Sequence, residues 1–227
     1  MKHKPWLLLI LPLAAIPSAG QISVHPVVSA TGQATVYVAP DQVKVDATVV
    51  TQGKSAQDAA GANATQVAAV VAALTKLLGQ GADITTVNYS IGPVYTYPPN
   101  APPVITGYSA SLTVETTLGN IAMTGAVIDA AIQAGVTSVG SLQFSLKDPE
   151  PSRQQALRAA AVQAGGHATA MAGALGRTVG AIVSLQEGSG ANIQPIVLGV
   201  QTPGAATSIT PGLIQVQATV VLQAQLN

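Results

Sequence analysis

Apolar and polar residues alternate along the segment that follows the N-terminal region, and this pattern predicts two long β-strands. From residue 43 to 49, valine and alanine occupy one face, while Lys44 and Asp46 belong to the other. A period of two is that of a half-buried strand. Residues 34–38 alternate in the same way. Pro40 separates the two runs and has no N–H to give to a sheet, so we expect one ribbon that bends there and serves two sheets.

Three later segments have apolar residues three and four positions apart, which is typical of amphipathic helices. They run from Ser55 to Gly79, from Ile121 to Gly135 and from Pro151 to Gly176. Ser55 is the expected N-cap of the first helix. The third helix is interrupted by two glycines at 165–166, where a kink could form. Its expected buried stripe contains mostly small residues, namely Leu157, Ala161, Ala164, Ala168, Met171 and Leu175.

The remaining alternating runs predict strands around these helices, and their order predicts the fold. Residues 42–147 follow the order β-α-β-β-α-β, which is that of the ferredoxin-like split βαβ unit. The first strand, the third helix and the last strands remain outside this unit. We therefore predict an α+β fold. A ferredoxin-like lobe of residues 42–147 is inserted in a second α+β lobe formed by both chain ends, residues 24–41 and 148–227.

The N-terminus has the features of a targeting segment. Lys2 and Lys4 precede an apolar run from Trp6 to Ile16, and small residues at 18–20 suit cleavage before Gln21. The apolar run is too short to cross a bilayer, which takes about 20 residues. We therefore expect residues 1–20 to be a signal peptide. The mature chain of residues 21–227 should then have no transmembrane segment and no tryptophan, since Trp6 is the only one.

The charge of the chain excludes some partners and favours another. Removing residues 1–20 takes away two lysines and no acid, which leaves seven basic against nine acidic residues. A nucleic-acid binder needs a basic surface, so we expect no nucleic-acid partner. Only 8% of the residues are charged, against about 25% in an average protein. Copies of such a chain repel one another weakly, which favours a homo-oligomer.

Residues with catalytic or metal-binding chemistry are few and scattered. The chain has no cysteine, and the mature part has only His25 and His167, which cannot form a histidine-rich metal cluster. Asp46 and Glu115 could pair across strands, but paired catalytic acids need a cleft around them. Residues 107–111 approach a Gly-x-Ser-x-Gly elbow but lack its second glycine. We expect no catalytic residue, no metal and no cofactor.

Two proline-containing stretches are candidate contact segments. Pro93–Pro103 holds five prolines and two tyrosines and should be largely extended or polyproline-like. It is either the tip that joins two antiparallel strands or a loop that contacts a partner. The second stretch, Gly188–Gly212, is uncharged and is either mobile or functional, with an extra strand conceivable at Ile193–Val200. The candidate partner-contact residues are Pro93, Tyr95, Tyr97, Pro98, Pro99 and Tyr108.

Short motifs along the chain resemble a known family. They are Val28-Ser29-Ala30-Thr31-Gly32-Gln33-Ala34 followed by Pro40-Asp41, then Asp83-Ile84-Thr85-Thr86, Thr106-Gly107-Tyr108, and Phe144-Ser145-Leu146-Lys147-Asp148. Their order resembles that of the SIMPL-domain family of exported bacterial proteins, from about Val27 to Leu226. The resemblance implies a periplasmic α+β protein without an established enzymatic activity. It also implies a link to oxidative or envelope stress, or a role as a surface antigen.

Two main functional hypotheses follow. The first is a non-enzymatic periplasmic protein that assembles with itself and serves as a scaffold or binding module. The alternative is a carrier of a small apolar ligand between the two lobes, in a cavity that would include Tyr108. A hydrolase comes third and would need two carboxylates, or His167 and an acid, in one cleft. We expect location in the periplasm, with peripheral association with the outer membrane, or secretion, left open.

Overall fold

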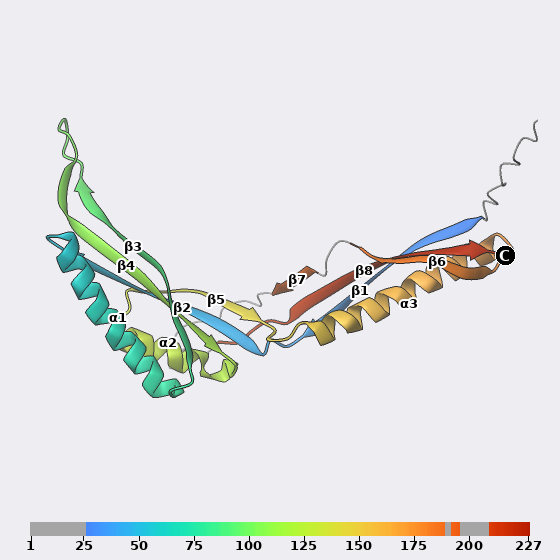
Figure 1. Ribbon diagram of the computed structural model, residues 1–227, viewed down its shortest axis with the longest axis horizontal. Helices are drawn as coiled ribbons and strands as arrows, with labels where there is room; N and C mark the ends of the chain where they lie inside the picture. The colour runs from blue at the N-terminus through green and yellow to red at the C-terminus, as the bar shows by residue number, and fades with distance from the viewer. Residues whose placement is uncertain (1–25, 189–191, 196–208) are drawn as a thin grey trace, which may run out of the picture.

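The computed structural model describes residues 26–188, 192–195 and 209–227 and has a mixed α+β architecture. The molecule is long and bent, with one antiparallel sheet toward each end and helices packed against each sheet (Figure 1). The described residues form two sheets and three α-helices. The signal peptide that we expect at residues 1–20, and also His25, lie outside the described residues.

The two sheets are joined by the ribbon with which the described chain begins. Strand β1 (Val27–Val38) belongs to one sheet and strand β2 (Gln42–Gly53) to the other, with Pro40 between them. This confirms the predicted bend. The Asp41 N–H donates to the Ser145 carbonyl over 3.2 Å, and an Asp41 carboxylate oxygen accepts from the Lys147 N–H over 2.7 Å. These two hydrogen bonds tie together the two chain segments that pass from one sheet to the other.

The first sheet has the strand order β3-β4-β2-β5, and each neighbouring pair is antiparallel. Strand β3 spans Asp83–Thr96, β4 spans Val104–Leu118 and β5 spans Ser138–Ser145. Helix α1 (Ala56–Leu78), the short 3-10 helix η1 (Ile121–Met123) and helix α2 (Thr124–Gln133) pack beside it. Its core contains Val43, Val45, Ala47, Val49, Val67, Val70, Leu74, Val114, Leu118, Val127, Ile128 and Ala131.

Helix α1 begins and ends where its sequence predicts. Ser55 and Asp58 form a capping box, in which each side chain accepts the backbone N–H of the other residue. Gly79 follows the helix with a φ of 91°, a backbone conformation that glycine adopts without strain. Residues Val67 to Leu74 supply the buried stripe. The helix is long and apolar enough to cross a membrane by length and composition, but its apolar stripe packs against the first sheet.

The second sheet is built around strand β8 (Ile214–Leu226). Strand β1 pairs with one edge of β8, and β6 (Val179–Glu187) and β7 (Asn192–Pro195) pair with the other. Alternate residues of β8, from Ile214 to Ala224, are buried as the sequence predicts. Of the extra strand conceivable at Ile193–Val200, only the part up to Pro195 lies within the described residues, and it is in β7.

Helix α3 (Glu150–Ala174) covers one face of this sheet, and its buried stripe differs from the predicted one. The buried residues occur at every fourth position: Ala156, Ala160, Ala164, Ala168 and Ala172. Met171 and Leu175, which we expected to be buried, are 42% and 73% exposed. The sequence spacing of α2 also predicts that Ile132 is buried together with Ile128 and Ala131, but Ile132 is 55% exposed. The helix also continues through Gly165 and Gly166.

The reason for the alanine stripe is a close approach of α3 to strand β1. A Cβ added at Gly32 would lie 2.0 Å from the carbonyl oxygen of Ala160 and 2.5 Å from the backbone nitrogen of Ala164. The backbone of the helix therefore rests almost directly on the strand. Side chains larger than alanine would hold the two elements apart, so the longer apolar residues of α3 face away from this contact.

Candidate functional site

The proline-rich segment forms the end of a long β-hairpin. Residues Pro93–Thr96 belong to β3 and pair with β4, with Pro93 opposite Tyr108 and Thr96 opposite Val104. The expectation of an extended or polyproline-like segment is therefore confirmed for these residues, which are extended as part of a β-strand. Strand β3 lies at the edge of the sheet, where a proline disrupts the ladder least. The interpretation as a tip between two antiparallel strands is confirmed, and the contact role stays a prediction.

The candidate contact residues do not form one cluster. Tyr95 and Tyr97 are 46% and 74% exposed near the tip, and their ring centroids are 6.5 Å apart. Pro93 and Pro99 are also exposed, and Pro98 is half-buried. Tyr108 is half-buried at the base of the hairpin and lines a pocket there. The structure thus separates an outer group, Pro93 to Pro99, from Tyr108.

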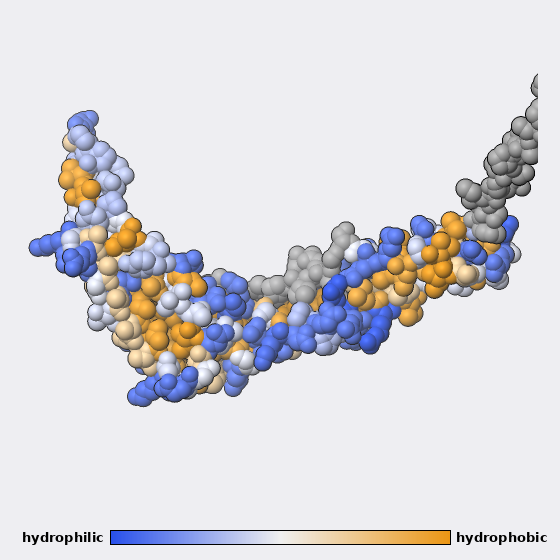
Figure 2. Space-filling model, in the orientation of Figure 1, coloured by the Kyte–Doolittle hydropathy of each residue, from blue (hydrophilic) through white to orange (hydrophobic). Residues whose placement is uncertain are grey.

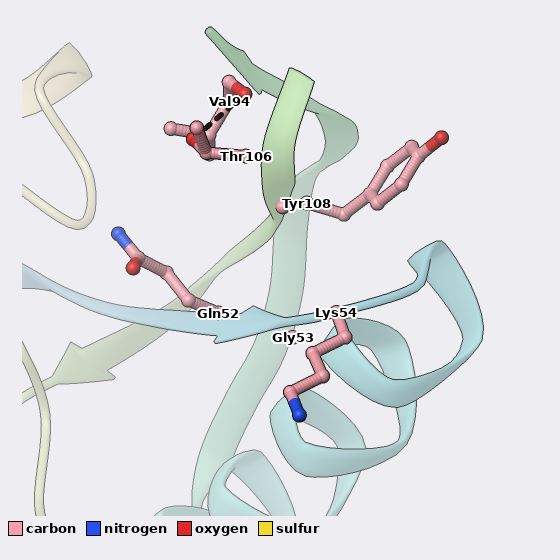
Figure 3. A pocket seen from close by; sticks show the side chains of 7 residues that line it. Gln52, Gly53, Lys54, Val94, Thr106 and Tyr108 are labelled. Carbon is pink, nitrogen blue, oxygen red and sulfur yellow. Dashed lines mark hydrogen bonds between the residues drawn. The ribbon is translucent and has the colours of Figure 1, made fainter. Parts of the chain in front are cut away.

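The pocket at the base of the hairpin has a volume of about 280 Å³ and lies between residues 52–54, at the end of β2 and just after it, and both hairpin strands. Figure 3 shows the Tyr108 ring and the Gln52 amide on opposite sides, with Thr106 beside Val94. The Thr106 hydroxyl donates to the Val94 carbonyl over 3.2 Å. No acidic side chain lines this pocket. Its polar groups do not converge on one point, so the arrangement does not support acid–base catalysis.

Two glycines explain why the elements come together at this pocket. A Cβ added at Gly53 would lie 2.5 Å from the backbone nitrogen of Ala59 in α1. A Cβ added at Gly107 would lie 3.0 Å from the Gly53 carbonyl oxygen. Backbone therefore packs on backbone at the base of the hairpin, which fixes the direction in which the hairpin leaves the sheet.

Asp46 and Glu115 do lie directly opposite each other on β2 and β4, yet they do not form a catalytic pair. Glu115 accepts a hydrogen bond from Lys44 Nζ over 2.8 Å. This bond raises the pKa of Lys44 above its ordinary value. Asp46 Oδ1 is buried without a hydrogen-bond partner, close to Gly140 of β5, where an added Cβ would lie 3.2 Å from the Asp46 Cβ.

The acidic and histidine side chains show no metal site. Among the described residues, no three His, Asp or Glu side chains gather in a way that could hold a metal ion. His167 is exposed on α3, and its Nδ1 lies 2.8 Å from the carbonyl oxygen of Thr31 in β1. One turn earlier, Gln163 Oε1 accepts the Gln33 N–H over 2.6 Å. The two side chains therefore cover part of the outer edge of β1, which is a structural role.

A second exposed apolar region was not expected from the sequence. On β6, Ile182 is 64% exposed, Val183 54% and Leu185 55%. Figure 2 shows hydrophobic surface at both ends of the molecule, on the hairpin and along the end that carries β6. The alternation of β6 predicts a strand but not which face is covered, because that depends on how far α3 extends over the sheet.

The described residues form a two-sheet α+β structure with a long, exposed hairpin at one end. Comparison with known proteins gives the family. Residues 28–224 match the SIMPL family, described as "Protein of unknown function (DUF541)". The chain belongs to this family, as its motifs indicate.

Individual relatives are more distant. The chain is 28% identical to the "26 kDa periplasmic immunogenic protein" of Brucella melitensis, over 77% of this chain and 72% of that protein. It is 29% identical to "Uncharacterized protein YggE" of Edwardsiella ictaluri, over 77% and 73%. It is 26% identical to the protein of the same name in Escherichia coli K12, over 74% and 68%.

Proposed function

We propose that this protein is a non-enzymatic binding module of the periplasm that assembles with copies of itself. The observation that carries the proposal is the exposure of apolar side chains on β6, with Ile182, Val183 and Leu185 each more than half exposed. Apolar side chains in adjacent positions of an edge strand favour association with another protein surface. The low charge of the chain, 8% of its residues, opposes such association only weakly.

The proposed location follows from the relatives. Two proteins that are each 28% identical to this chain are named periplasmic, and the N-terminus has the pattern of a signal peptide. The proposed link to envelope or oxidative stress rests on the family resemblance alone. A deletion strain that grows normally in the presence of peroxide and of detergent would argue against that link.

The proposed architecture has two lobes. The strand order β3-β4-β2-β5 with antiparallel neighbours, and helices α1 and α2 packed beside this sheet, support a ferredoxin-like arrangement of residues 42–147. The pairing of β1 with β8 supports a second lobe made from both chain ends. In this arrangement the exposed β6 belongs to one lobe and the hairpin to the other, which leaves two separate surfaces for contacts.

The carrier hypothesis receives less support. The pocket that contains Tyr108 is open and lies at the base of the hairpin. A second pocket of about 240 Å³ lies at the far end of the other sheet, beside Met171 and Leu175. Neither pocket lies between the two sheets. A binding module is therefore the function that the geometry supports best.

Self-association can be tested by light scattering after size exclusion, on the protein exported to the periplasm. We expect an oligomer that dissociates toward monomers when Ile182 and Leu185 are both replaced by serine. Val162→Ser is the matched control, because Val162 is 77% exposed on α3 and faces away from the sheet. A wild-type protein that stays monomeric at high concentration would contradict the proposed self-association. If the control variant dissociated as much as the β6 variant, the proposed role of β6 would be wrong.

A further inference from the structure

The outer part of the β3–β4 hairpin stands free of the rest of the molecule. Strand β2 pairs with β4 only as far as Gly53, opposite Tyr108. Strands β3 and β4 continue to pair with each other to Thr96, opposite Val104. Beyond β2, the hairpin is a two-stranded ribbon at one extreme of the long molecule (Figure 1). An isolated two-stranded ribbon is only marginally stable in water.

The outer part of the hairpin carries no charged side chain, and the exposed large side chains of the hairpin are aliphatic or aromatic. No Asp, Glu, Lys, Arg or His occurs between Asp83 and Glu115. The exposed large side chains with their exposed fractions are Tyr89 at 56%, Ile91 at 43%, Tyr95 at 46%, Tyr97 at 74%, Val104 at 53% and Ile105 at 49%. Tyrosines with an apolar body and a polar tip stand beside aliphatic residues, as in segments that lie at a boundary between water and an apolar phase.

The backbone of the tip is poor in hydrogen-bond donors. Of residues 98–103, only Asn100 and Ala101 carry an N–H, because the others are prolines. The Ala101 N–H donates to the Pro98 carbonyl over 3.4 Å. Moving a backbone N–H out of water without a partner is costly, so a tip with few donors can leave bulk water at a lower cost than an ordinary loop of the same length.

We propose that the tip of the β3–β4 hairpin, from Tyr95 to Ile105, inserts into the headgroup region of a lipid bilayer. This inference rests on the proposed function as a binding module and names the partner of its contact loop. Tyrosine is enriched at the membrane–water interface. Both ribbon edges beyond β2 have unpaired backbone groups, and such edges do not occur in the hydrocarbon region. The insertion is therefore shallow, with the aliphatic residues held at the level of the tyrosines.

The shape of the hairpin favours a bilayer over a protein partner. A stable protein interface buries about 800 Å² on each partner, whereas the ribbon is narrow and ends in a single turn. A bilayer needs no complementary shape, and a protruding tip reaches it without interference from the rest of the molecule. Helix α1 is a weaker candidate for the same contact, because its apolar stripe packs in the core of the first sheet.

The test uses a single tryptophan as a reporter. The only native tryptophan, Trp6, lies in the expected signal peptide, and it is replaced by phenylalanine in the gene so that no native tryptophan remains whether or not the peptide is cleaved. Tyr97→Trp then places the reporter at the tip, and Tyr37→Trp, at a residue of β1 that is 56% exposed, is the matched control. The probes are vesicles of phosphatidylcholine alone and of phosphatidylethanolamine with phosphatidylglycerol, each with and without brominated chains. Emission is followed at low and at high salt.

We expect the reporter at position 97 to shift to shorter wavelength with both kinds of vesicle and to be quenched by brominated lipid, with little effect of salt. The reporter at position 37 should not change. The pair Val104→Ser and Ile105→Ser should lower vesicle partition about tenfold, while circular dichroism and oligomer size stay unchanged. Equal shifts of both reporters, no shift at position 97, or unchanged partition of the serine pair would each overturn the proposal.

One further outcome separates this inference from the proposed function. The emission at position 97 could shift to shorter wavelength without lipid as the protein concentration rises. This would mean that a second copy covers the hairpin, which would overturn the bilayer contact and support self-association. Conversely, the protein could be monomeric in light scattering while the reporter at position 97 responds to vesicles. That result would contradict self-association and support the bilayer contact.

Discussion

Among the described glycines of the second sheet, Gly32 leaves the least room for a side chain. Its missing side chain lets the backbone of α3 approach β1, and an added Cβ would lie 2.0 Å from the Ala160 carbonyl oxygen. Because the obstacle is backbone and not a flexible side chain, the helix as a whole would have to move. We expect Gly32→Ala to lower the free energy of unfolding by about 3 kcal/mol, measured by urea denaturation.

Gly165→Ala is the control for this substitution. Gly165 lies in α3, and an added Cβ there would have no atom within 4 Å. Alanine is a better helix former than glycine, so this variant should gain up to about 1 kcal/mol. If both variants lost stability equally, close packing at Gly32 would not be the cause.

At the scale of elements, strands β2 and β4 place like charges opposite each other. Lys44 offsets the repulsion between Asp46 and Glu115 through its hydrogen bond to Glu115. We expect Lys44→Met to lower the melting temperature by a few degrees at neutral pH, because two carboxylates then face each other without a cation.

The alkaline behaviour of the same pair has a defined sign. The pKa of Lys44 is raised above 10.5 in the folded state by its hydrogen bond to Glu115. The stability that the pair contributes is therefore fully present below about pH 10.5 and is lost as the pH rises through the folded-state pKa. Thermal melts of the wild type and of Lys44→Met at a series of alkaline pH values check this loss of stability. If the melting temperatures of the wild type and Lys44→Met differed by the same amount at every pH, packing of the Lys44 side chain and not its charge would cause the difference in stability.

Elements with strong local signals could be predicted from the sequence, and their tertiary environment could not. The capping box of Ser55 and Asp58 defines the start of α1. The apolar stripe of this helix, which includes Val67, Val70 and Leu74, is buried. In α3, alanine occurs on several faces, so the sequence pattern does not decide which face is buried. That choice is made by Gly32, more than a hundred residues away. The predicted stripe therefore included Met171 and Leu175, which the structure exposes.

The same distinction applies to the candidate site. Its prolines predict a strand connection at residues 93–103, and a hairpin tip lies there. The length of the free ribbon was not predictable, because it depends on where β2 stops pairing with β4, at Gly53. The exposure of Ile182 on β6 was not predictable either, because the alternation of an edge strand does not tell which of its side chains a neighbouring element covers.

At the scale of the whole molecule, the bend at Pro40 decides how folding is divided. The first core draws its buried residues from Val43 to Ala131. The other two buried clusters combine β8 with α3, and one of them includes Val28 and Ala30 of β1. We expect a fragment of residues 41–148 to fold alone, because it contains all four strands of the first sheet, both of its helices and the Asp41–Lys147 hydrogen bond.

The reverse experiment is a chain that ends at Gly188. It lacks β8, the central strand of the second sheet, and so both β1 and β6 lose the strand with which they pair. Measured by circular dichroism in urea, this chain should show the same unfolding transition as the fragment of residues 41–148. The part of the circular dichroism signal that comes from the second sheet should be lost. A fragment of residues 41–148 that stayed unfolded would mean that the two sheets form one cooperative unit. In that case, the hydrogen bonds of Asp41 at the bend would connect two halves of a single core.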